Sequence, residues 1–265
     1  MFFTVLTSTI SVAFPTKFDR ITIVMSIIYT PRGKALEYSD LAANLYTGCS
    51  HGCRYCYCPA ILRMKIDDWA DDPKPRRDVL NQLDKDAAKL HGDLREILLS
   101  FMSDPYHSDG AAIVTRQALL ILERHNLRVQ VLTKGGKRSI GDFDILERNG
   151  WKFGSTIICR SEKLRQDWEP GAASIEERIE TVREAHRRGI FTWVSVEPVV
   201  DVAEALAVMR ELRDVVDLWK VGKLNHNKEL ESAIDWKQFL YDTEETLAGK
   251  NFIIKKDLEK FRAVE

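Results

Sequence analysis

The chain has 265 residues, of which 45% are hydrophobic and 30% are charged. These proportions are ordinary for a soluble globular protein, and they exclude a disordered chain, a collagen-like fibre and a coiled coil. Its 39 Lys and Arg residues and 40 Asp and Glu residues give a net charge of −1, whereas a protein that binds nucleic acid through bulk charge is usually strongly basic. No apolar run approaches the ~20 residues of a membrane-spanning helix, so we expect no membrane partner.

Residues 1–24 are predicted to be an amino-terminal extension outside the folded core. The segment is apolar enough for a secretory signal, but it lacks a basic n-region and a clear cleavage site. A loosely attached extension and an upstream start codon, with Met25 rather than Met1 as the functional start, are the other interpretations.

Short β-type runs then alternate with amphipathic helical runs through residues 25–224. The predicted strands are Asn44–Thr47, Glu96–Phe101, Arg128–Leu132, Trp151–Ile158, Phe191–Val196 and Leu218–Val221. The predicted helices are Arg76–Lys89, Ala112–Glu123, Ile140–Arg148, Ser174–Arg188 and Val202–Arg213. The fourth helix begins with the capping box S-I-E-E and ends at Gly189. The charge-rich stretch Asp67–Arg77 is predicted to be a loop.

The predicted strands are apolar through most of their length, which is typical of strands buried on both faces of a parallel sheet. Right-handed crossovers curl such a sheet. The sequence therefore predicts an α/β fold, a partial (β/α)6 TIM-like barrel over residues 25–224. Residues 225–265, with a helical run at Asp235–Leu247, are predicted to be a carboxyl-terminal helical extension that covers the open side. In a parallel barrel the chemistry collects at the carboxyl ends of the strands.

Four of the five cysteines lie in a ten-residue stretch, Cys49 to Cys58. This stretch belongs to the loop after the first predicted strand, Y-T-G-C-S-H-G-C-R-Y-C-Y-C-P. This clustering favours a metal site in a reducing, cytoplasmic compartment over a disulfide framework. The C-x₃-C-x₂-C spacing of Cys49, Cys53 and Cys56 can hold three corners of a cubic iron–sulfur cluster and leave the fourth iron open. The alternative is a structural zinc site completed by Cys58 or His51, although zinc ligands usually come as two separated pairs.

This loop resembles the signature of the radical S-adenosylmethionine (SAM) superfamily. The wider pattern N-L-Y-T-G-C-S-H-G-C-R-Y-C-Y resembles the spore photoproduct lyase-like branch, often described as DNA repair photolyases. The motifs S-D-P-Y at Ser103–Tyr106, T-K at Thr133–Lys134, W-E-P-G at Trp168–Gly171 and K-V-G-K-L-N at Lys220–Asn225 agree with it. The resemblance spans about residues 40 to 225.

The resemblance implies a [4Fe–4S] cluster on Cys49, Cys53 and Cys56, with SAM bound to the open iron. A flavodoxin or ferredoxin would deliver one electron, and SAM would be cleaved to methionine and a 5′-deoxyadenosyl radical. The radical would abstract hydrogen from an unidentified substrate, with a DNA lesion as one candidate. The alternative function is a non-catalytic iron–sulfur or zinc module that binds a partner, and SAM cleavage separates the two.

The sequence departs from this branch at the second strand. Spore photoproduct lyase has a cysteine there, which returns a hydrogen atom to the product radical. This sequence has Met102–Ser103 instead, and the chain is shorter than the full lyase. Both differences argue against thymine-dimer repair.

Candidate SAM contacts follow the predicted strands. The resemblance implies Tyr55 for the adenine, Ser103 and Asp104 for the amino group, and Ser155 for the ribose. Lys134 and Glu197, at strand ends, are candidates for the carboxylate and for the ribose or the substrate respectively. Four of these residues have a structural alternative. Tyr55 could pack as an aromatic, Asp104 could form an Asx turn before Pro105, Lys134 could be a solvated loop lysine, and Glu197 could be a turn residue.

The candidate catalytic residues are Cys58, Cys159 and Glu197. Cys58 lies two residues after the last predicted ligand, and Cys159 follows the fourth strand beside Arg160, whose charge would lower the pKa of the thiol. Both cysteines could instead pack as small hydrophobic residues. If the substrate is DNA, local basic residues must compensate for the net charge. The candidates are Lys74, Arg76, Arg77, Lys134, Lys137, Arg138 and, as the weakest pair, Arg187 with Arg188.

Overall fold

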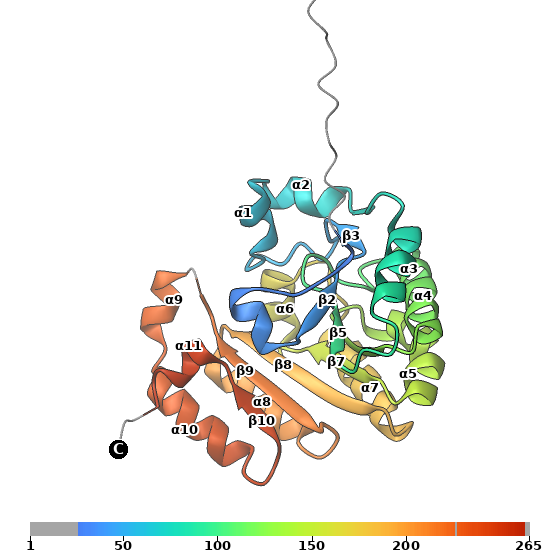
Figure 1. Cartoon of the computed structure of the whole chain (residues 1–265). Helices are drawn as coiled ribbons and strands as arrows, with labels where there is room; N and C mark the ends of the chain where they lie inside the picture. Colours follow the sequence, from blue (N-terminus) through green and yellow to red (C-terminus); the bar gives the residue numbers. More distant parts are fainter. Residues whose placement is uncertain (1–25, 226, 263–265) are drawn as a thin grey trace, which may run out of the picture.

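The computed structural model describes residues 26–225 and 227–262, so the expected amino-terminal extension with Met1 and Met25 lies outside the described residues. An eight-stranded sheet in the order β1-β2-β5-β6-β7-β8-β9-β10 forms the centre of the molecule (Figure 1). Neighbouring strands are parallel except β1 with β2. The strands are β1 (Ile28–Tyr29), β2 (Leu41–Ala43), β5 (Glu96–Leu99), β6 (Arg128–Thr133), β7 (Lys152–Thr156), β8 (Phe191–Val199), β9 (Leu218–Lys223) and β10 (Phe252–Ile254).

Helices connect the parallel strands and cover one face of the sheet. They include α3 (Val79–Lys89), α4 (Asp109–Arg124), α5 (Phe143–Asn149), α6 (Glu162–Trp168), α7 (Ile175–Arg187) and α8 (Val202–Leu212). Figure 1 shows α3, α4 and α5 together on one flank of the sheet, with α9 (Lys228–Ala233) and α10 (Trp236–Thr246) on the other. This arrangement confirms the predicted α/β partial barrel, and the sheet remains open because β1 and β10 are its two edges.

The core has two parts, one on each face of the sheet. The larger part packs the outer face of the sheet against the helices, as with Val194 of β8 and Ile179 of α7. The smaller part, formed by Ala42, Leu98 and Trp193, lies on the inner face. Because side chains alternate along a strand, the neighbours Trp193 and Val194 serve opposite faces.

The prediction of the first strand was displaced by several residues. The barrel strand is β2, whereas β3 (Tyr46–Thr47) pairs with β4 (Lys74–Pro75) in a separate two-stranded sheet. Asn44 ends the barrel strand, because its side-chain oxygen accepts hydrogen bonds from the backbone N–H groups of Phe101 and Met102, both at 3.0 Å.

The charged stretch Asp67–Arg77 was predicted as a loop and instead contains α2 (Ile66–Asp71) and β4. Trp69 is the reason, since its side chain is buried and its carbonyl accepts a hydrogen bond from the backbone N–H of Cys49 at 3.2 Å. The helix thereby supports the cysteine loop.

The carboxyl-terminal segment was predicted to be helical, and it does contain α9, α10 and α11 (Lys256–Glu259). It also supplies β10, which extends the sheet next to β9 and was missed. Three contacts join this segment to η1 (Gly33–Glu37) and the adjacent Tyr38 across the open side of the barrel. Lys34 pairs with Asp257, the N–H of Lys256 donates to Glu37 at 2.9 Å, and Lys255 lies over the Tyr38 ring.

None of the helices in the described ranges is long and apolar enough to cross a membrane.

Candidate functional site

Two glycines let the backbone of the cysteine loop, residues 48–58, turn sharply. Gly48 and Gly52 have positive φ angles of 94° and 56°. A Cβ on Gly48 would lie 2.8 Å from the Cα of Pro73, so glycine is required for this close approach. The loop leads directly into α1 (Cys58–Leu62).

The W-E-P-G segment holds the cysteine loop from the other side. The backbone N–H of Arg54 donates to the carbonyl of Trp168, and the N–H of Gly171 donates to the carbonyl of His51, both at 2.9 Å. A Cβ on Gly171 would lie 2.1 Å from the carbonyl oxygen of Ser50. The motif that supported the family resemblance is therefore a backbone support for the loop.

A fully buried ion pair fixes the aromatic residue between the last two cysteines of the motif. Glu169 and Arg178 are 2.5 Å apart and have no solvent exposure. Glu169 also accepts a hydrogen bond from the hydroxyl of Tyr55, and Arg178 donates to the carbonyl of Thr156 at 3.1 Å. The sequence analysis did not single out either charged residue, although Glu169 stands inside the W-E-P-G motif.

A cavity of about 950 Å³ opens at the carboxyl ends of the barrel strands. It is lined by the predicted site residues Cys49, Cys53, Tyr55, Cys56, Cys58, Ser103, Asp104, Lys134 and Glu197. Ser155 and Cys159 are buried and do not line it. Their side chains donate to the carbonyls of Thr133 and Ser161 respectively.

Lys134 carries a cation into this cavity. Its ammonium lies 5.7 Å from the centre of the Tyr55 ring and makes no ion pair or hydrogen bond with any residue in the described ranges. Burial lowers the pKa of Lys134, but the negative charges of Cys53, Glu169 and Asp104 outweigh burial and raise it. The ammonium is therefore a fixed positive charge beside the cysteines.

Asp104 forms the Asx turn that was the structural alternative, since its carboxylate accepts a hydrogen bond from the N–H of Tyr106 at 2.8 Å. It also accepts from the hydroxyl of Thr133 and the N–H of Lys134, both at 2.6 Å. Burial would raise the pKa of Asp104, but nearby His51 and these hydrogen bonds hold it below its usual value. The hydroxyl of Ser103 donates to the carbonyl of Gly48 at 2.6 Å and ties this turn to the cysteine loop.

His51 was named only as an alternative zinc ligand. Its side chain is almost completely buried, with Nδ1 at 3.5 Å from the carboxylate of Asp104 and Nε2 without a hydrogen-bond partner among the residues that the structure describes. Burial lowers the pKa of His51 to about 4, so the imidazole is neutral at physiological pH.

The thiols of the loop differ in their electrostatics. Burial raises the pKa of Cys49 to about 12 and also raises the pKa of Cys53. A hydrogen bond from Cys58 lowers the pKa of Cys56 to about 7. Cys58 also donates to the carbonyl of Phe101 at 3.4 Å. Metal binding requires thiolates, so a cationic group is needed to charge Cys49 and Cys53.

The donor set is compatible with three cysteine ligands of an iron–sulfur cluster. Three thiols from one glycine-turned loop line one cavity beside the cation of Lys134. No three His, Cys, Asp or Glu side chains of residues 26–225 and 227–262 form a group that could hold a single metal ion. A cluster separates its cysteine ligands more widely than one zinc ion does.

Glu197 lies against β9 rather than forming a simple turn. Its carboxylate accepts a hydrogen bond from the hydroxyl of Tyr38 and lies 3.6 Å from the ammonium of Lys255. The hydroxyls of Tyr38 and Ser195 are hydrogen-bonded at 3.0 Å. A Cβ at Gly222 would lie 2.6 Å from the Glu197 carboxyl carbon, so glycine makes room for this side chain. Neither Tyr38 nor Lys255 was identified from the sequence.

A parallel partial barrel with a three-cysteine loop at its strand ends is the arrangement that the sequence analysis expects of a SAM-cleaving enzyme. The sequence profile described as the radical SAM superfamily matches residues 43–215. The chain belongs to this superfamily, and the expectation of an enzyme is confirmed.

Solved structures of this class share the fold. Spore photoproduct lyase complexed with dinucleoside spore photoproduct is 15% identical, with a TM-score of 0.64 over 88% of this chain and 80% of that chain. SuiB of Streptococcus suis bound to S-adenosylmethionine is 10% identical, with a TM-score of 0.61 over 83% of this chain and 51% of that chain. An uncharacterized protein of Methanocaldococcus jannaschii is 23% identical over 74% of this chain and 73% of its own length.

Proposed function

We propose that Cys49, Cys53 and Cys56 hold a [4Fe–4S] cluster and that Lys134 binds the carboxylate of SAM. One observation carries this proposal: the three thiols line the same cavity as the ammonium of Lys134, which makes no direct ion pair or hydrogen bond with the described residues. Lys134 is partly shielded from solvent, and its N–H groups are free to donate to a carboxylate that enters the cavity.

The cluster would supply the electron that cleaves SAM to methionine and a 5′-deoxyadenosyl radical, after reduction by a flavodoxin or ferredoxin. The residues of the chain bind SAM and orient it. Tyr55, fixed by Glu169, presents its ring to the adenine. Asp104 positions Lys134 through the backbone N–H, and its carboxylate has little capacity left for the amino group of SAM. We expect the enzyme to work in the cytoplasm, where thiols stay reduced.

The test is anaerobic reconstitution with iron and sulfide, followed by an assay for 5′-deoxyadenosine with dithionite and SAM. The wild-type chain should bind iron, show the broad visible absorbance of a cluster and release 5′-deoxyadenosine. Cys53→Ala should lose all three, whereas Cys159→Ala should keep them because Cys159 lies outside the cavity. Stoichiometric zinc without iron after anaerobic purification would contradict the cluster assignment.

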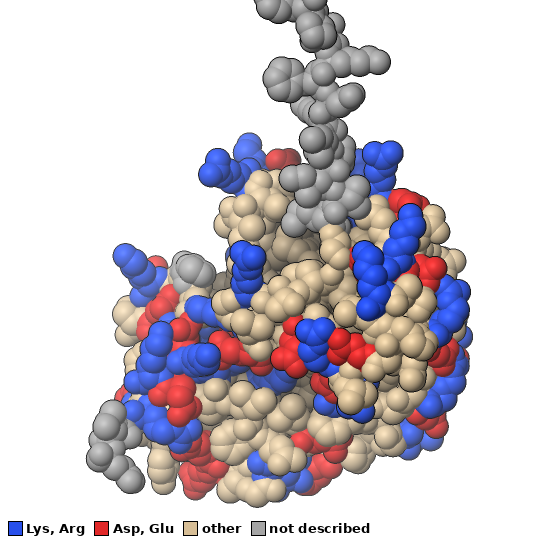
Figure 2. Space-filling model, viewed as in Figure 1, with Lys and Arg blue, Asp and Glu red and all other residues tan. Residues whose placement is uncertain are grey.

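A DNA lesion is a second candidate for the substrate, by analogy with the lyase complexed with dinucleoside spore photoproduct. The cavity favours an anionic substrate, because six Lys and Arg residues and two carboxylates line it, a difference of four positive charges. Most of the predicted phosphate contacts, however, are paired with carboxylates. Lys137 pairs with Glu180, and Arg138 with Asp109. Figure 2 shows basic and acidic side chains interspersed on the visible face.

We therefore expect weak DNA binding, which should lose most of its strength between about 50 and 200 mM salt because phosphate contacts release counterions. Fluorescence anisotropy with a labelled oligonucleotide measures it. The double variant Lys137→Glu, Arg138→Glu should weaken binding further. Absence of binding at low salt, or binding that is unchanged in the double variant, would favour a peptide or small-molecule substrate.

A further inference from the structure

The carboxyl-terminal segment adds a cation to the cavity that the six-strand core does not contain. Strand β10 pairs with β9, and the backbone N–H of Lys255, directly after β10, donates to the carbonyl of Val221 at 2.9 Å. The side chain of Lys255 is 4% exposed, and its ammonium lies 3.5 Å from the centre of the Tyr38 ring. The residue lines the same cavity as the cysteines.

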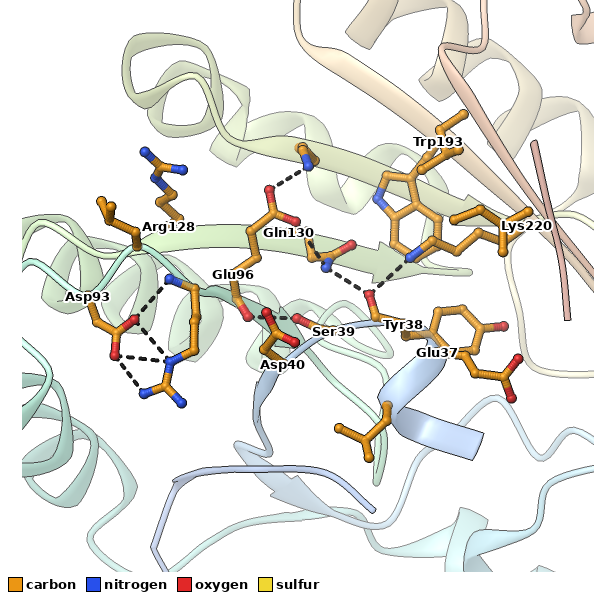
Figure 3. Close-up of a pocket in the computed structure, with 16 residues that line it drawn as sticks. Glu37, Tyr38, Ser39, Asp40, Asp93, Glu96, Arg128, Gln130, Trp193 and Lys220 are labelled. Carbon is orange, nitrogen blue, oxygen red and sulfur yellow. Dashed lines mark hydrogen bonds and ion pairs between the residues drawn. The ribbon is translucent and has the colours of Figure 1, made fainter. Parts of the chain in front are cut away.

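Tyr38 holds this corner of the cavity in place and is itself anchored from both ends. Its carbonyl accepts hydrogen bonds from Gln130 and Lys220, both at 3.0 Å. These two side chains converge on it in a separate hollow of about 610 Å³ at the amino ends of the strands (Figure 3). Its hydroxyl contacts Glu197 and Ser195 at the other end of the ring. Tyr38 and Glu197 are therefore already held in position by the protein's own hydrogen bonds when no ligand is bound.

The ammonium of Lys255 is incompletely paired. Its 3.6 Å contact with Glu197 is too long for a good hydrogen bond, and no hydrogen bond joins it to another described residue. Lys223, the nearest cation of β9 on this cavity, differs because it is hydrogen-bonded to Glu231 at 2.6 Å. With one long carboxylate contact and the Tyr38 ring beside it, the buried ammonium still has N–H groups that can donate to an acceptor entering the cavity.

We propose that Lys255 is a substrate-binding residue, and that the group it binds is an anionic oxygen of a carboxylate or a phosphate. Glu197, which accepts a hydrogen bond from Tyr38, keeps the ammonium of Lys255 directed at the cavity. Its carboxylate also offsets the positive charge of the ammonium until the anion binds. The proposal rests on the proposed function, because it assigns the cysteine side of the cavity to the cluster and SAM and the β8–β10 side to the substrate.

The test uses simple anions, because the substrate is unidentified. The full-length chain with ¹³C-labelled lysine, with and without reconstituted cluster, is titrated separately with inorganic phosphate and with acetate at constant ionic strength. The Lys255 Cε signal, assigned with Lys255→Met, should shift and saturate with a dissociation constant of about 1–10 mM for at least one anion. Saturation by phosphate alone would indicate a phosphate group in the substrate, and saturation by acetate alone would indicate a carboxylate.

Variants separate anion binding from a structural ion pair. Glu197→Gln removes the competing carboxylate and should tighten anion binding by at least about threefold. Neither variant has a Lys255 signal, so binding is measured by line broadening of the added anion's own NMR signal. Lys255→Arg should retain saturable binding, and Lys255→Met should abolish it. Methionine keeps the apolar stem over the Tyr38 ring, and thermal melting checks that the variant is folded.

Lys250 is the matched control, since it precedes β10, pairs with Asp214 at 3.1 Å and does not line the cavity. The proposal is overturned if the Lys255 signal of the folded wild-type chain moves with neither anion, or moves no more than that of Lys250. This readout does not need SAM cleavage. Saturable anion binding without 5′-deoxyadenosine would reject the proposed function alone, and the reverse result would reject the role of Lys255 alone.

Discussion

Lys134 differs from an ordinary loop lysine because its ammonium is enclosed among an aromatic ring, thiols and buried carboxylates. Lys134→Ala should weaken SAM binding about ten- to a hundredfold, the effect of losing a charged hydrogen bond worth roughly 1.5–3 kcal/mol. Calorimetry on the reconstituted protein measures this affinity, and the iron content should be unchanged. Lys137→Ala, which alters an exposed lysine nearby, is the control. Unaltered affinity in the Lys134 variant would refute its assignment.

Gly171 is a second position where a small substitution should change the site, because a side chain there has no room beside the cysteine loop. An alanine Cβ would lie 2.1 Å from the carbonyl oxygen of Ser50, so Gly171→Ala must displace the cysteine loop. The variant should lose most of its iron on reconstitution, measured as iron per chain. Gly141→Ala is the matched control, because a Cβ there meets nothing within 4 Å. Equal iron content in both variants would show that the loop tolerates the displacement.

The buried pair of Glu169 and Arg178 makes stability depend on pH. Burial alone would raise the pKa of Glu169, but Arg178 and Lys134 outweigh burial and hold it below its ordinary value of 4.5. The pair therefore contributes fully to the free energy of unfolding above pH 4.5, and the contribution is lost as the pH falls through the folded-state pKa. Urea unfolding across this range should show the loss, and Glu169→Gln should remove it.

Removal of one partner should be more damaging than removal of both. Arg178→Met leaves a buried carboxylate unpaired, which costs about 3–5 kcal/mol. The double variant Arg178→Met, Glu169→Gln should recover part of that loss in the same urea experiment. A double variant no more stable than Arg178→Met would show that packing rather than charge dominates here.

The elements whose signals are local were predicted well. Helix α7 begins after Ser174, as its capping box predicts, and the hydroxyl of Ser174 accepts from the N–H of Glu177 at 3.2 Å. The reciprocal half of the box is absent, because the Glu177 carboxylate instead accepts from the N–H of Lys137 at 2.7 Å. A contact forty residues away in the sequence thus replaced the local one.

Ser174→Ala should lower the free energy of unfolding by about 1 kcal/mol through loss of this cap. Ser174→Asn, which retains an acceptor, should lose little. Chemical denaturation compares the two variants with the wild-type chain. An Ala variant as stable as wild type would mean that the contact of Glu177 with Lys137 fixes the start of the helix.

Elements that depend on distant partners were misplaced or missed. The first strand was predicted to begin at Asn44, whereas the barrel strand ends just before it. The side chain of Asn44 accepts hydrogen bonds from the backbone of Phe101 and Met102 in place of strand pairing, and no local sequence pattern reveals this contact. Strand β10 has only three residues and is a strand because β9 lies beside it.

At the scale of the whole molecule, the parallel order of the six core strands and the position of the cysteine loop at their carboxyl ends followed from the sequence. The site was predicted as far as its residues lie in contiguous motifs, which include the three cysteines, Lys134 and Glu197. Tyr38 and Lys255 were missed because their partner Glu197 is remote in the sequence, whereas Arg178 lies only nine residues from Glu169 and was missed because no motif marks it. Tyr38 and Glu197, for example, are 159 residues apart.

The contacts between η1 and α11 also set an order of events during biosynthesis. The hydrogen bond from the backbone N–H of Lys256 to the side-chain carboxylate of Glu37 joins residues 219 apart. The ribosome releases the cysteine loop about 200 residues before that partner, and at roughly 5–20 residues per second this interval lasts on the order of 10–40 s. Until then the nascent chain lacks the contribution of Lys255 to the cavity lining. The cysteine loop is therefore synthesised well before the residue that completes the β8–β10 side of the cavity.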